Sequence, residues 1–243
     1  MPPAPVSTEK ILAEGQMLIK GLVPWASNYT FLVTVTLGEA EALAIYKPSA
    51  GERPLWDFDS GTLYLREVAA YRVSIFLGWP AVPPVVAREG PHGAGSVQAY
   101  VPNDPLEHYF AIRERSEAAA ALRRIALFDH VVNNADRKGG HVLRGEDGTI
   151  WAIDHGLTFH TDYKLRTVIW DWAGSPIPRP WLDDLANLRE ALADGSSALR
   201  ASLEGLILSS EVTALRRRID MALRDRHLPR PLPTGRNVPY PLV

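Results

Sequence analysis

The chain has 243 residues, 46% of them hydrophobic and 22% charged, which is enough apolar material for one large globular unit or for two lobes. The formal net charge of −2 argues against a general attraction to nucleic acid or to an anionic membrane surface. The absence of cysteine excludes disulfides, thiolate metal sites and a cysteine nucleophile. No secretion signal and no membrane span are recognisable, so we expect a cytoplasmic protein.

The N-terminal half is predicted to be rich in β-structure. A short helix over residues 7–14 opens it. Segments enriched in β-branched and aromatic residues follow, separated by breaks that contain Pro, Gly or Ser, and this pattern predicts sequential antiparallel strands. These strands cover residues 15–23, 28–37 and 41–47. A polar loop over 48–59 then leads to a helix predicted over 60–78.

The rest of the chain is predicted to contain a few short strands and several long helices. Residues 82–86 and 95–101 are expected to be strands around a loop over 87–95, with the second strand at an edge of the sheet. The remaining predicted elements are a helix over 116–134, a strand–turn–strand over 141–154, and helices over 181–208 and 210–226.

Strands come first in this order and helices last, which predicts an α+β protein with two lobes and a cleft between them. We expect a small, antiparallel, β-rich N-lobe over residues 1–101 and a mainly helical C-lobe over 102–227. The last residues, 228–243, are too rich in proline for a helix and are expected to form an extended or disordered tail.

Polar side chains that can carry chemistry are concentrated in residues 133–156. Asp136 follows a predicted helix and precedes a Gly-Gly loop, and Asp154 ends the second, apolar strand of the hairpin. A two-residue turn at Asp147-Gly148 would place His141 directly opposite Asp154, with Cβ atoms about 4.5–5.5 Å apart, so that both could hold one metal ion. A longer turn would change the register and remove this pairing, and a hairpin with solvated polar ends is the alternative.

Two segments carry a family resemblance. NNADRKGGHVL and IWAIDHG together resemble the catalytic and metal-binding segments of the phosphatidylinositol 3-/4-kinase-like group, and they are most similar to type II phosphatidylinositol 4-kinases and HipA-like protein kinases. The resemblance covers roughly residues 15–175 and implies a protein-kinase-like fold that binds ATP with Mg²⁺ or Mn²⁺.

The resemblance also implies roles for individual residues. Asp136 becomes the aspartate that orients or deprotonates an acceptor hydroxyl, Arg137 belongs to the same catalytic motif, and Asp154 becomes the metal aspartate. The chain departs from the pattern at His141, where the group usually has a metal-binding asparagine. Imidazole is a poor ligand for magnesium and suits Mn²⁺ or Zn²⁺ better, which puts ordinary two-magnesium catalysis in doubt.

The N-terminal half should supply the remaining nucleotide contacts. Lys47, in the segment AIYKP, is expected to bind the α- and β-phosphates, with Glu67 as its ion-pair partner. The link between the first two strands has no glycine-rich pattern, but Ser27 and Asn28 could cap the phosphates. The interlobe hinge is expected at Gln98, Ala99 and Tyr100, whose backbone groups would hydrogen-bond adenine.

The leading hypothesis is an ATP-dependent phosphotransferase whose acceptor is a hydroxyl of a protein or a small molecule. A nucleotide-binding pseudokinase with a regulatory role is the first alternative, favoured by His141 and by the missing glycine-rich loop. An AMP-transferring enzyme and, less favoured, a metal-dependent hydrolase built on His141, Asp154, His155 and Asp136 also remain open. The expected partners are therefore a nucleotide and an acceptor, with no nucleic acid and no membrane span.

Overall fold

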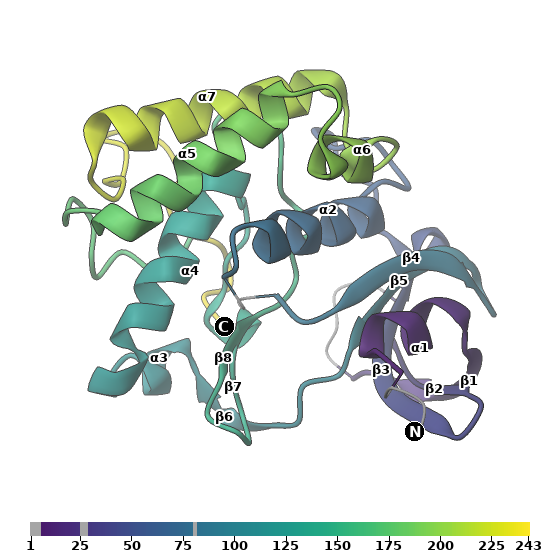
Figure 1. Ribbon diagram of the computed structural model, residues 1–243. Coiled ribbons are helices and arrows are strands. Elements are labelled where there is room, and N and C mark those ends of the chain that lie inside the picture. The colour runs from purple at the N-terminus through teal and green to yellow at the C-terminus, as the bar shows by residue number, and fades with distance from the viewer. Residues whose placement is uncertain (1–5, 25–28, 80–81) are drawn as a thin grey trace, which may run out of the picture.

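An antiparallel sheet forms the N-terminal region (Figure 1). The structure is a computed structural model that describes residues 6–24, 29–79 and 82–243. The five strands of this sheet lie in the order β1-β2-β3-β5-β4. Their bounds are β1 Gln16–Leu22, β2 Phe31–Leu37, β3 Ala40–Pro48, β4 Val85–Gly90 and β5 Gly93–Ala99. The predicted succession of three antiparallel strands is confirmed, and the β4–β5 hairpin extends it.

The β4–β5 hairpin corrects two expectations. Strand structure continues to Gly90 and resumes at Gly93, so most of the predicted loop over 87–95 is hairpin, and the positive φ of 92° at Gly93 permits the tight turn. β5 also pairs with both β3 and β4 and is not an edge strand. Gly95 explains the close pairing with β3, because a Cβ atom there would lie 2.4 Å from the carbonyl oxygen of Lys47.

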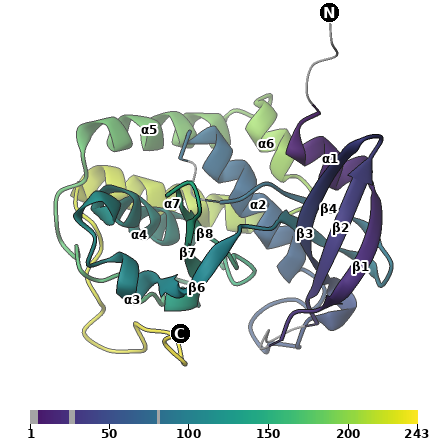
Figure 2. The same ribbon diagram turned by 90° about the horizontal axis from the view of Figure 1, so that it is seen from below.

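Two helices pack against this sheet. Helix α1, Thr8–Glu14, begins at Ser7, whose side chain accepts a hydrogen bond from the Lys10 N–H, and it covers one face of the sheet. Helix α2, Leu63–Phe76, contacts β4 and β5 and also α6 of the C-terminal region. The buried side chains of α2 belong to the same apolar cluster as those of α4, α5 and α7, so α2 joins the sheet to the helical core (Figure 2).

Helices dominate the C-terminal region, which confirms the predicted α+β class. Their bounds are α3 Tyr109–Ile112, α4 Ala119–Val132, α5 Arg179–Ala193, α6 Ala198–Leu203 and α7 Ser209–Asp225, with short 3-10 turns at Ser116–Ala118 and Gly139–His141; a further 3-10 turn, Ser49–Gly51, follows β3 in the N-terminal region. A second sheet has the order β6-β7-β8, with β6 Asn103–His108, β7 Val142–Gly145 and β8 Ile150–Ala152. Within the described residues no helix is long and apolar enough to cross a membrane.

The register of the β7–β8 hairpin differs from the prediction by one residue. Arg144 pairs with Ile150, and the N–H of Gly145 donates to the carbonyl of Thr149 at 2.8 Å, so the turn has three residues. Gly148, with φ of 83°, makes this longer turn possible. His141 therefore does not lie opposite Asp154 in the ladder.

Candidate active site

Lys47, near the end of β3, is the cation at the centre of the candidate site. Its Nζ lies 2.5 Å from Oε1 of Glu67 on α2 and 3.4 Å from Oδ1 of Asp154, which follows β8. Burial opposes a charge on this ammonium group, but Asp154 and Glu67 outweigh burial and raise the pKa of Lys47. The structure thus brings together three residues that lie up to 107 positions apart in the sequence.

Glu67 is held from two sides. Besides its contact with Lys47, its Oε2 accepts a hydrogen bond of 3.0 Å from the Ser96 hydroxyl on β5, and the side chain is buried. Ser96 was not among the predicted site residues, and a single serine in a strand carries no sequence signal for such a role. Because one carboxylate oxygen accepts from Lys47 and the other from Ser96, the orientation of the Glu67 carboxylate does not depend on a bound ligand.

The α2 helix that carries Glu67 is anchored to the C-terminal region by the preceding residue. Arg66 is buried and its Nη1 lies 2.6 Å from Oε1 of Glu211 on α7 and 2.8 Å from the carbonyl oxygen of Thr158. Side chains of neighbouring helix residues point about 100° apart, so Arg66 reaches α7 while Glu67 reaches β3. The other Glu211 oxygen accepts from the Leu208 N–H at the start of α7.

Asp154 reaches His141 although the predicted ladder pairing is wrong. Its φ of 59° turns the chain away from β8, and its Oδ2 comes to 3.3 Å from Nε2 of His141. The side chain keeps 43% of its surface exposed, so the carboxylate is open to an ion. Burial of its surroundings acts to raise the pKa of Asp154, but Lys47 and His141 hold it well below the usual range.

Both ring nitrogens of His141 have polar partners. Nδ1 lies 3.1 Å from the carbonyl oxygen of Asp136, to which it could donate, and 3.5 Å from the backbone nitrogen of Lys138, from which it could accept. Burial lowers the pKa of His141 to about 4, partly offset by Asp154, so the ring is neutral at pH 7. Nε2 lies 3.3 Å from Oδ2 of Asp154, so a cation placed between them could be bound by both groups.

The loop that carries Asp136 is built by side-chain hydrogen bonds. Helix α4 ends at Asn133 with φ of 59°, and the side chain of Asn134 accepts from the Asp136 N–H at 3.0 Å. Nζ of Lys138 lies 3.2 Å from Oδ2 of Asp136. Burial raises the pKa of Asp136, while Lys138 opposes that rise. Lys138 was not predicted as a site residue, although its position two residues after the aspartate is a usable signal.

Arg137 has a different position from the one its motif suggests. Its side chain is fully buried, which favours a positioning role over direct contact with a substrate. Nε and Nη2 donate to the two carboxylate oxygens of Asp129 on α4 at 2.8 and 2.9 Å. Nη1 donates to the carbonyl oxygen of Ile153 at 2.6 Å, and Nη2 lies 2.7 Å from Nε2 of His155. Arg137 therefore ties the Asp136 loop to the residue before Asp154.

The backbone groups expected to contact adenine are partly engaged within the protein. The N–H groups of Ala99 and Tyr100 already donate to the carbonyls of Pro84 and Leu43, at 2.8 and 2.9 Å, and the side chain of Gln98 is buried in the sheet. These two N–H groups are thus not available to a base, because they complete the β5 ladder. Ser27 and Asn28 lie outside the described residues.

A metal would need ligands beyond the protein. Among the described residues, no group of three or more His, Cys, Asp or Glu side chains could hold an ion. Asp154 and His141 could supply two ligands, and a Mg²⁺ or Mn²⁺ ion commonly takes its other ligands from phosphates and water. The residues present therefore fit an ion that arrives with a polyphosphate better than a resident ion.

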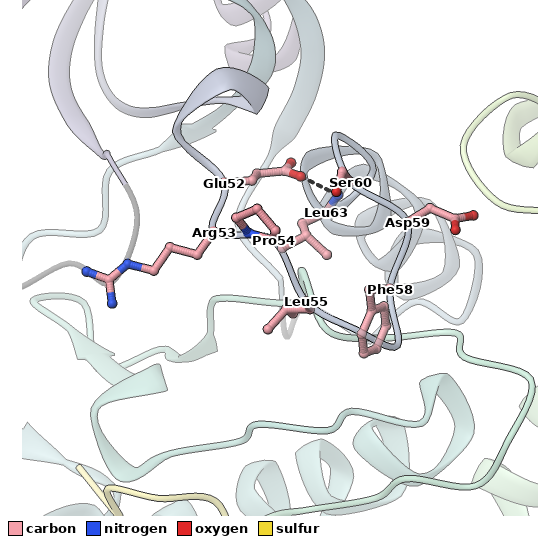
Figure 3. A pocket seen from close by; sticks show the side chains of 8 residues that line it. All are labelled: Glu52, Arg53, Pro54, Leu55, Phe58, Asp59, Ser60 and Leu63. Carbon is pink, nitrogen blue, oxygen red and sulfur yellow. Dashed lines mark hydrogen bonds between the residues drawn. The ribbon is translucent and has the colours of Figure 1, made fainter.

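A hollow formed by the loop before α2 and by the start of that helix lies outside this group of residues (Figure 3). Its lining side chains are Glu52, Arg53, Pro54, Leu55, Phe58, Asp59, Ser60 and Leu63. Glu52 accepts hydrogen bonds from the N–H groups of Leu63 and Tyr64, at 3.3 and 2.9 Å, and so caps the start of α2. The hollow contains none of the residues that meet at Lys47.

Comparison with known proteins places the chain in a family and a fold. No family model matches the chain. It shares 11% identity with the crystal structure of the Helicobacter pylori proinflammatory kinase CtkA, with a TM-score of 0.51 over 89% of this chain and 94% of that one, which shows a kinase-like fold. It is 40% identical over 265 aligned positions to Protein Rv2133c of Mycobacterium tuberculosis, covering 95% of this chain and 94% of the relative. The chain therefore belongs to the same family as Protein Rv2133c.

Proposed function

We propose that the chain is an ATP-dependent phosphotransferase that uses a divalent metal. The observation that carries the proposal is the contact of Lys47 with both Glu67 and Asp154 in a kinase-like fold. An ammonium group held between two carboxylates is kept charged and in place, which is what binding of the α- and β-phosphates requires. The electrostatic influence of Asp154 on Asp136 supports a common site for the two aspartates.

The roles of the individual residues follow from their surroundings. Asp154 and His141 would hold the metal ion, which would neutralise phosphate charge when bound. The neutral imidazole favours Mn²⁺ over Mg²⁺. Asp136 has its pKa raised by burial, and Lys138 lies beside it and opposes that rise. Asp136 would accept a hydrogen bond from the acceptor hydroxyl and orient it in line with the γ-phosphate.

The remaining contacts are also part of the proposal. Ser27 and Asn28 would cover the phosphates, and the end of β5 with the next residue, Gln98–Tyr100, would contact adenine through carbonyl groups, since the N–H groups of Ala99 and Tyr100 are engaged. The segments 133–143 and 150–156 support a place near type II phosphatidylinositol 4-kinases and HipA-like kinases within the kinase-like fold.

The second candidate is a nucleotide-binding pseudokinase. The specific observation in its favour is His141 at the position where the kinase-like pattern has a metal-binding asparagine. It predicts nucleotide binding without turnover in the presence of any metal. Transfer of AMP in place of phosphate would release pyrophosphate, and this product distinguishes AMP transfer from phosphotransfer, which releases ADP.

Binding and turnover measured on matched variants test the proposal. We expect Lys47→Met to weaken ATP binding about 10–100-fold, because one charge-assisted contact contributes about 1.5–3 kcal/mol. Asp136→Ala should retain binding within about twofold and lose turnover with Mg²⁺ and with Mn²⁺. Lys20→Met, the same change at an exposed residue of β1, is the control and should bind like the unaltered chain. Equal ATP affinity in Lys47→Met and the unaltered chain would refute the proposal.

A further inference from the structure

The C-terminal segment, residues 237–243, returns from the end of α7 to the neighbourhood of α3 and the small sheet (Figures 1 and 2). Its first residue is anchored firmly. The carbonyl oxygen of Asn237 accepts from the Thr167 N–H and from Nε1 of Trp170, both at 3.1 Å. The side-chain amide of Asn237 in turn makes two hydrogen bonds with the backbone of Leu232, at 2.9 and 2.8 Å. The segment therefore has a defined starting point on the C-terminal region.

The far end of the C-terminal segment contacts the loop that carries Asp136. The Gly139 N–H, three residues after Asp136, donates to the carbonyl oxygen of Leu242 at 2.7 Å. A Cβ atom at Gly139 would lie 2.9 Å from the Phe110 ring and 3.3 Å from that carbonyl oxygen, so only glycine allows this close approach. A Cβ atom at Gly140 would meet nothing closer than 3.8 Å. The contact is thus specific to one of the two glycines.

The same stretch of chain supports both the Asp136 loop and the C-terminal segment. The Arg137 N–H donates to the carbonyl of Arg166 at 2.9 Å, and the Val168 N–H donates to the carbonyl of Arg137 at 3.1 Å. Thr167, between them, donates to Asn237. The C-terminal segment consequently lies alongside the backbone that positions Asp136.

This location matters for the acceptor. In-line transfer requires that the acceptor hydroxyl approach the γ-phosphate from the side opposite the leaving ADP. The nucleotide would contact Lys47 and Asp154, so the acceptor would approach past Asp136 and the residues that follow it. An extended peptide binds such a surface through free backbone N–H and C=O groups. The N–H groups of Gly139 and Thr167 are already bound to the C-terminal segment.

We propose that the C-terminal segment selects the acceptor by size, admitting a small hydroxyl compound to Asp136 and excluding an extended polypeptide. The proposal rests on the proposed phosphotransferase function. The transfer itself forms a bond between the acceptor oxygen and the γ-phosphorus, breaks the bond to the ADP oxygen, and passes the acceptor proton to Asp136. The segment would act only on which hydroxyl reaches that position.

The test compares the full chain with a chain ending at Arg236, and Gly139→Ala with the matched control Gly140→Ala. Hydrogen exchange of the backbone amide at position 139 should accelerate at least tenfold in the shortened chain and in Gly139→Ala, because its acceptor is removed or displaced. Transfer of phosphate from ATP to a mixture of Ser-, Thr- and Tyr-containing peptides should rise at least tenfold in the same two proteins. The nucleotide dissociation constant should stay within about twofold, and Gly140→Ala should resemble the unaltered chain.

Each other outcome has a defined meaning. Equal or slower peptide phosphorylation without the segment overturns size selection, and unchanged exchange at Gly139 shows that the segment does not dock. Absence of nucleotide binding in all four proteins, the full chain included, refutes the phosphotransferase function itself, whatever the result of hydrogen exchange. Nucleotide binding without transfer to any acceptor refutes the phosphotransferase and the acceptor role together. If the shortened chain fails to fold, seen as loss of its melting transition, Gly139→Ala decides alone.

Discussion

Removing the carboxylate of Asp129 should destabilise the protein more than any exposed charge change. Asp129 and Arg137 are both fully buried and joined by hydrogen bonds of 2.8 and 2.9 Å. In Asp129→Asn the guanidinium keeps one amide oxygen as an acceptor but loses its countercharge. Leaving one member of a buried ion pair uncompensated costs about 3–5 kcal/mol, and we expect the lower end, because the oxygen remains.

The size of the effect can be measured by urea unfolding followed by circular dichroism. A loss of about 3 kcal/mol corresponds to a fall in melting temperature of about 6–12 °C for a chain of this size. Asp183→Asn is the matched control, since its partner Arg179 is exposed and the pair lies on the surface of α5. That change should alter the free energy of unfolding by no more than about 0.5 kcal/mol. A loss below about 1 kcal/mol in Asp129→Asn would contradict the reasoning.

The other predictions concern pH, strand contact and the anchoring of α2. Burial lowers the pKa of His130 and His141 to about 4, so below about pH 6.5 the unfolded chain binds more protons than the folded one. The free energy of unfolding should therefore fall as the pH drops, by about 2 kcal/mol per histidine at pH 5. A free energy of unfolding that stays flat between pH 7 and 5 would contradict this. Gly95→Ala should separate β3 from β5 and weaken ATP binding, whereas Gly21→Ala, which meets nothing within 4 Å, should not; equal affinities would refute the steric account. Glu211→Gln should lower the free energy of unfolding in urea by about 3 kcal/mol, because the buried guanidinium of Arg66 on α2 loses its countercharge. An unchanged unfolding midpoint would show the pair to be dispensable.

The features that sequence predicts well are those carried by local pattern. The alternation of β-branched residues before Lys47 indicates strands, and these form. The long apolar helix before Asn133 forms as well, although it begins later than expected, at Ala119. Segments with weak local signals were missed, among them β6, which contains Pro105 and charged residues and pairs irregularly with β7.

The candidate site depends on contacts that local pattern does not contain. The proximity of His141 to Asp154 was predicted from a ladder register that is wrong, and it arises instead from the left-handed backbone of Asp154. The burial of Arg137 depends on Asp129, eight positions away on a helix, and on the carbonyl of Ile153 in the hairpin. Such details are set by tertiary packing, and a motif names the residue types without fixing which of them face solvent.

The geometry of the site is controlled by Arg137, whose contacts lie within the C-terminal region, and by α2, which contacts both the N-terminal sheet and the C-terminal helices. Arg137 binds the backbone before Asp154 and belongs to the loop of Asp136, so the two aspartates are positioned by one buried cation on the helical core. Lys47 belongs to the sheet and is placed through Glu67 on α2, whose buried face packs with the C-terminal helices. The separation between Lys47 and Asp154 is therefore set by where α2 sits. A change that shifts α2 should move the ammonium group relative to both aspartates while leaving the aspartates fixed to each other.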